Sequence, residues 1–130
     1  MSWVIDRPNR RVINKDLGIS LVEGKGRDGD IHFVLMDRAG DQIADFYSRS
    51  DGHNEEHNKS APAATNFSAV VTVFGLYELR NTNSLIINDR KFSVSEVVSL
   101  IRDALIQAVG GYDLGFPKYV SIVFKDDWLT

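Results

Sequence analysis

The chain has 130 residues, a formal net charge of −3, 43% hydrophobic and 25% charged residues, and no cysteine. These values exclude disordered and fibrous classes, disulfide frameworks and cysteine nucleophiles, and they predict a single folded domain over residues 1–130. The acidic balance also argues against a protein whose main task is to bind nucleic acid, because that affinity depends on Lys and Arg contacts to phosphates.

The N-terminal segment becomes charged at Asp6 and Arg7 and therefore lacks the apolar centre of a secretion signal. No stretch approaches the roughly 18 apolar residues of a membrane span. We therefore expect a cytoplasmic protein that does not contact a membrane.

The first half of the chain is typical of strands and turns. Short branched apolar runs predict strands at 11–14 and 18–23, and the glycine-rich run 24–29 predicts a loop after them. Segments 31–36 and 43–48 flank a turn at 38–41 and predict a hairpin. Because apolar residues occupy both faces of 31–36, we expect an inner strand there.

Residues 50–66 are polar and predict a long mobile loop, a kind of segment that is uncommon in compact domains and is often functional. The following run, 67–80, has apolar residues on both faces of a strand, with Tyr77 on the same face as Val71 and Val73, and predicts a central strand. Within it, Gly75 predicts a bulge or bend. A short strand is expected at 85–88, and Asp89 and Arg90 should then turn the chain toward a helix.

The clearest local signal is a helix over 94–109. Ser93 and Glu96 have the spacing of a capping box, and Phe92 and Val97 that of a hydrophobic staple. Gly110 and Gly111 are expected to end the helix. One apolar stripe should pack on the sheet. It consists of Val94, Val97, Val98, Ile101, Ala104, Leu105 and Ala108.

A last strand is expected at 118–124. Several strands precede the single long helix, so the alternation of strands and helices that builds parallel sheets is missing. The prediction is an α+β fold: a mostly antiparallel sheet of about six to seven strands with one major helix in the C-terminal half, packed on one face.

Two patterns resemble chemical motifs but lack their context. Residues 24–29 have the letters Gly-x-Gly-x-x-Gly, yet a strand follows where a dinucleotide site needs a helix. His53 and His57 have the spacing of two zinc ligands on one helical turn, but the residue after His53 is Asn54 and the setting is polar. We therefore expect that the protein binds no cofactor and no metal. The alternative is a metal site formed by His53 and His57.

A third group offers acid–base chemistry only if folding brings its members together. It consists of His32, His53, His57, Arg7, Arg10 and Arg11. His32 is better explained as a hydrogen-bonded or edge-facing sheet residue, and the arginines as solvating an edge strand. No catalytic signature supports an active site, so we expect no catalytic residues.

The remaining possibility is a surface for another protein. Aromatic residues between glycines near the C-terminus are candidate interface anchors, and acidic residues are candidates for steering a basic partner. The simpler alternatives are aromatics packed into the core and a solvated acidic face. The candidates are Tyr112, Asp113, Phe116, Tyr119, Asp51, Glu55, Glu56, Asp126 and Asp127.

These observations predict a protein-binding domain, most concretely a small bacterial immunity protein that neutralises a toxin domain, such as a nuclease, by covering its active site. The partner would be a basic protein. The alternatives are a small enzyme or ligand-binding domain that uses the histidines of 50–66, and a structural subunit of a larger, viral assembly. The oligomeric state stays open.

Overall fold

A computed structural model describes residues 3–24, 32–48, 66–111 and 119–125. Their main element is a seven-stranded sheet in the order β1-β2-β3-β4-β5-β6-β9, antiparallel throughout except where β9 pairs in parallel with β6. This confirms the predicted α+β class and the mostly antiparallel sheet. The strands are β1 (Trp3–Asp6), β2 (Arg11–Asn14), β3 (Ile19–Gly24), β4 (His32–Met36), β5 (Gln42–Ser48), β6 (Asn66–Val73) and β9 (Tyr119–Phe124).

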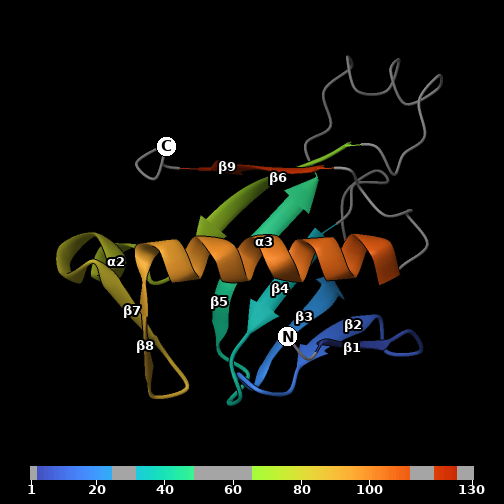
Figure 1. Cartoon of the computed structure of the whole chain (residues 1–130), viewed down its shortest axis with the longest axis horizontal. Coiled ribbons are helices and arrows are strands. Elements are labelled where there is room, and N and C mark those ends of the chain that lie inside the picture. The colour runs from blue at the N-terminus through green and yellow to red at the C-terminus, as the bar shows by residue number, and fades with distance from the viewer. Residues whose placement is uncertain (1–2, 25–31, 49–65, 112–118, 126–130) are drawn as a thin grey trace.

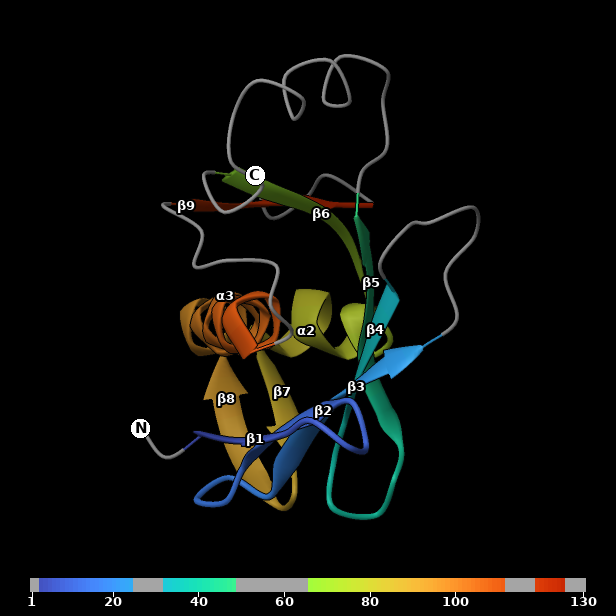
Figure 2. The ribbon, with the colours of Figure 1, turned by 90° about the vertical axis from the view of Figure 1, so that its right-hand side faces the viewer.

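The sheet curls around one long helix, α3 (Val94–Gly111) (Figure 1). Figure 2 shows α3 end-on, with β9 and β6 above it, β5 and β4 to its right, and β1 to β3 below. The helix contacts β1 and β2 near one edge of the sheet and β9 at the other. Its predicted apolar stripe is buried or half-buried, so the stripe faces the sheet as expected.

The start of α3 is held by the predicted capping box. The Glu96 backbone N–H donates to Ser93 Oγ at 3.2 Å, and the Ser93 N–H donates to Glu96 Oε1 at 2.9 Å. The hydrogen bond that the carboxyl accepts from the Ser93 backbone N–H, followed by the interaction with the Ser93 side chain, lowers the pKa of Glu96. Phe92 and Val97, the staple pair, are both buried.

The end of α3 differs from the expectation, because the helix continues through Gly110 to Gly111. Ala108 and Val109 are buried and hold the last turn in the core. Glycine disfavours a helix by only about 1 kcal/mol per residue, so packing outweighs the local stop signal.

The predicted strand over 67–80 is wrong in its second half. β6 ends at Val73, and residues Leu76–Thr82 form a helix, α2. Gly75 lies at the N-terminus of that helix, and its carbonyl accepts from the Leu79 N–H at 2.9 Å. Leu79 is buried, whereas Tyr77, predicted to share a strand face with Val71 and Val73, is 72% exposed. Leu76 and Leu79 are three residues apart, which places them on one face of a helix but on opposite faces of a strand. Both side chains pack into the core from the same face of α2.

Two strands were not predicted. β1 pairs with β2 at the sheet edge, and β8 (Arg90–Ser93) pairs with β7 (Ser84–Ile87) in a separate hairpin. The turn between β7 and β8 is therefore at Asn88 and Asp89, both with positive φ, and not at Asp89 and Arg90. These short runs become strands because a partner strand is available, which local sequence does not reveal.

Asn88 connects three turns that are distant in the sequence. Its Nδ2 donates to the Leu17 carbonyl at 2.8 Å and the Gly18 carbonyl at 3.1 Å, in the β2–β3 turn. Its Oδ1 accepts from the Arg38 N–H at 2.8 Å, in the β4–β5 turn. The small hairpin is thus tied to the large sheet at one end of the molecule.

The described helices include none that is long and apolar enough to cross a membrane.

Candidate functional site

The sheet has an inner face toward α3 and an outer face on the opposite side, defined here by three rows of residues paired across the strands. The register places one row through Asp6, Arg11, Val22, Val34, Asp45 and Thr72, a second through Gly24, His32, Tyr47, Val70 and Val123, and a third through Val4, Ile13, Ser20, Met36 and Gln42.

This outer face is partly exposed and mixed in character. Its side chains on β3, β4 and β6 are half-buried, whereas Gln42 and Tyr47 on β5 are exposed, Tyr47 by 42%. Neither α2, α3 nor the β7–β8 hairpin lies on this side of the sheet (Figure 2). Six inter-strand spacings add up to about 29 Å, measured along the curve of the sheet. Apolar side chains in the middle with polar groups around them are typical of a protein-binding surface.

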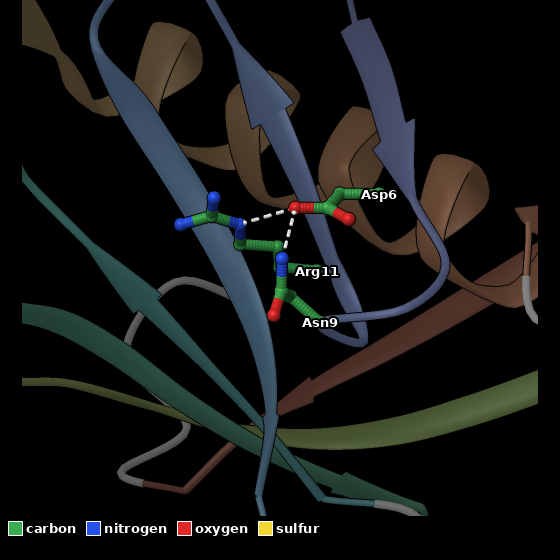
Figure 3. A network of polar contacts seen from close by, with 3 residues as sticks. All are labelled: Asp6, Asn9 and Arg11. Atoms are coloured by element: carbon green, nitrogen blue, oxygen red, sulfur yellow. Dashed lines mark hydrogen bonds and ion pairs between the residues drawn. The ribbon is translucent and has the colours of Figure 1, made fainter.

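One polar group on this face is a network at the β1–β2 turn (Figure 3). Asp6 Oδ2 accepts from Asn9 Nδ2 at 2.9 Å and from Arg11 Nε at 2.8 Å. The hydrogen bond from Asn9 and then that from Arg11 lower the pKa of Asp6. Arg10 pairs with Glu23 of β3. Arg10 and Arg11 therefore brace the edge of the sheet through specific ion pairs, in addition to any solvating role.

The second polar group is a hydrogen-bonded pair of His32 Nε2 on β4 and Asp45 Oδ1 on β5, which becomes an ion pair when the imidazole is protonated. The ring lies against the backbone of β3, because a Cβ at Gly24 would come within 2.6 Å of His32 Nδ1. His32 is hydrogen-bonded, as predicted, and it lies on an interior strand and not at an edge. Gly24, which began the glycine-rich run, thus gives space to the imidazole.

The sequence-predicted site residues are not tested by the structure. Tyr119 begins β9, but its side chain is not among those described. Every other predicted partner-binding or metal-binding residue lies outside the described residues: Asp51, His53, Glu55, Glu56, His57, Tyr112, Asp113, Phe116, Asp126 and Asp127. His53 and His57 therefore cannot be placed beside His32 or the arginines.

Sequence reasoning did not identify the outer face as a site. The signal was present, since 31–36 and 67–73 have apolar residues on both faces. That pattern predicts interior strands, which β4 and β6 are, but it does not by itself indicate a binding surface. Apolar residues on both faces of an antiparallel sheet favour a second covering layer or a partner, and the described helices lie only on the inner side.

Within the described part of the chain, no three His, Asp or Glu side chains come together as a metal site. His32 and Asp45 alone supply two candidate ligands, fewer than the three protein ligands of a catalytic zinc site.

Comparison with protein-family models, with curated proteins and with solved structures finds no match to this chain.

Proposed function

We propose that this chain is a cytoplasmic protein-binding domain, most concretely a bacterial immunity protein that neutralises a toxin domain by covering its active site. The observation that carries the proposal is the outer face of the sheet. There, apolar side chains lie between the Asp6–Arg11 ion pair and the His32–Asp45 hydrogen-bonded pair, and no described helix or hairpin packs on them. A stable protein complex buries roughly 800 Å² of surface on each partner. A seven-stranded face has the scale to supply a large part of that area.

The composition favours a protein partner over nucleic acid. The chain has 18 Asp and Glu against 15 Lys and Arg. On the outer face, Arg11 and His32 are already paired with carboxylates, so they do not form a phosphate-binding patch. An acidic chain attracts a basic partner, and nucleic-acid-cleaving toxins must carry basic surfaces to bind their substrates.

The predicted anchors Tyr112, Phe116 and Tyr119 belong to this proposal as a second contact region. Acidic residues such as Asp51 and Glu55 would steer the partner and raise its association rate. Reversing their charges should slow association and leave dissociation nearly unchanged. An unchanged association rate would argue against the steering role.

The test is co-expression with the C-terminal domain of the product encoded immediately upstream. We expect the two chains to co-purify in equal amounts and the host cells to survive only when both are present. A toxic upstream domain that does not bind this chain would contradict the proposal. Absence of both toxicity and binding would redirect attention to a small ligand and to the histidines of 50–66.

The variant Val34→Lys tests the role of the outer face, because Val34 lies near its centre, between Val22 and Asp45 in the first row. We expect this variant to fold and to lose the complex. The matched control is Tyr77→Ser, which changes the most exposed aromatic side chain of the described residues at α2, away from the outer face. Loss of binding in the control alone would place the interface elsewhere.

A further inference from the structure

We propose that Asp45, His32 and Tyr47 form a binding site for an arginine side chain of the partner. The inference rests on the proposed function, because it names the chemistry that the outer face recognises. The three residues lie on adjacent strands, with His32 directly opposite Tyr47 and Asp45 two residues before Tyr47 on the same face.

One carboxylate oxygen of Asp45 is held by a hydrogen bond, and the other can accept a hydrogen bond from a ligand. His32 Nε2 pairs with Asp45 Oδ1, and the described residues provide no hydrogen-bond partner for Oδ2. A carboxylate accepts several hydrogen bonds, so Oδ2 keeps its capacity for a further donor. The Asp45 side chain is 35% exposed, which leaves this oxygen within reach of a ligand.

The Asp45 carboxylate is held in position before a ligand binds. His32 orients Asp45 from β4, and Gly24 lets the imidazole lie against β3. A group that is already oriented loses less conformational entropy on binding. The half-buried Val34, directly opposite Asp45, excludes part of the solvent, which strengthens an ionic hydrogen bond.

The aromatic side chain of Tyr47 makes this site more favourable for arginine than for lysine. Tyr47 is 42% exposed and lies two residues from Asp45 on the same face of β5. A guanidinium group is planar and weakly hydrated, so it can stack on such a ring while its N–H groups donate to a carboxylate. A lysine ammonium is compact and strongly hydrated and gains less from the ring. A phosphate is excluded because the carboxylate would repel it.

The experiment is an NMR titration of the complete chain with N-acetyl-arginine methylamide, at constant ionic strength, compared with the blocked lysine analogue. We expect chemical-shift changes centred on His32, Asp45 and Tyr47, with the lysine analogue binding at least about fivefold more weakly. Equal responses to both compounds, or shifts spread over all acidic residues, would overturn the proposal.

Two variants sharpen the titration. Asp45→Asn keeps a hydrogen-bonding side chain of the same size and removes the charge, and it should weaken arginine binding about tenfold. Glu78→Gln, at an exposed position of α2, is the matched control and should leave binding unchanged. Similar losses of arginine binding in both variants would show that binding depends only on the net charge of the protein, and would contradict a defined site.

This titration needs no partner protein, so its outcome is separate from that of the co-expression experiment. Arginine binding without a toxin complex would support the site and count against the immunity function. A toxin complex that is unaffected by Asp45→Asn would support the function and overturn the arginine site.

Discussion

The two faces of the seven-stranded sheet come from the same strands but experience different surroundings. Neighbouring residues on β5 illustrate this, because Phe46 is fully buried against the core whereas Tyr47 is 42% exposed on the outer face. The inner face is almost entirely apolar, and the outer face combines apolar side chains with the Asp6–Arg11 and His32–Asp45 pairs.

The difference indicates a division of roles. Burial of the inner face provides the main stabilising free energy, since the hydrophobic contribution scales with the apolar area removed from water. The outer face contributes less to stability and keeps its apolar and ionic groups accessible. We therefore expect substitutions on the inner face to change stability and substitutions on the outer face to change binding.

The largest expected effect comes from comparing Phe46→Ala with Tyr47→Ala. Removing the Phe46 ring leaves a cavity in the core and should lower the free energy of unfolding by about 3–5 kcal/mol. Tyr47→Ala should lower it by less than about 1 kcal/mol, because a half-exposed side chain loses few buried contacts. Urea denaturation measures both. Equal losses would show that the outer face is also part of the structural core.

The next effect concerns the turns that join the small hairpin to the sheet. Asn88→Gly keeps the positive φ accessible but removes three hydrogen bonds to other turns, and we expect a loss of about 1–3 kcal/mol. The adjacent Asp89→Gly is the control, since Asp89 also has positive φ and is exposed. A loss as large for Asp89→Gly would indicate a backbone effect and no specific role for the Asn88 amide.

A smaller effect is expected at the start of α3, the helix that covers the inner face. Ser93→Ala removes the side-chain oxygen that accepts from the Glu96 N–H, at an expected cost of about 1 kcal/mol in unfolding free energy. Ser99→Ala, in the exposed middle of the helix, should be neutral or slightly stabilising because alanine favours helices. Thermal denaturation of both variants measures the difference, and a stable Ser93→Ala protein would show that packing alone positions α3.

The smallest expected effect is a decrease of stability at acid pH. One carboxyl on each side of the sheet contributes to it. Asp6 on the outer face and Glu96 on α3 both have lowered pKa values in the folded protein. Their stabilising contribution is therefore complete above the ordinary carboxyl pKa of about 4 and is lost as pH falls through the lower folded value. Below about pH 5, the stability of the wild type should decrease more steeply than that of the Asp6→Asn, Glu96→Gln double variant. Parallel stability curves would contradict these assignments.

The candidate site could be predicted from sequence only in part. His32 was expected to be a hydrogen-bonded sheet residue, and the structure adds that its partner is Asp45, 13 residues further on. The loop and terminal candidates, such as Tyr112 and Glu55, stay predictions. The outer face itself was not predicted, because an apolar residue in a strand does not reveal whether a helix, a partner or solvent lies next to it.

Local sequence determined the features whose physical causes are local. The capping box, the staple and the 3.6-residue stripe specified α3, and the alternation around a polar turn specified the β4–β5 hairpin, because all their contacts lie within a few residues. Tertiary structure decided the end of β6, where burial of Leu79 favoured α2, and it paired β1 and β8 with their neighbours. It also decided which side of the sheet α3 covers. Strands with apolar residues on both faces permit either choice locally, and only the packing of the whole chain distinguishes the core from the exposed surface.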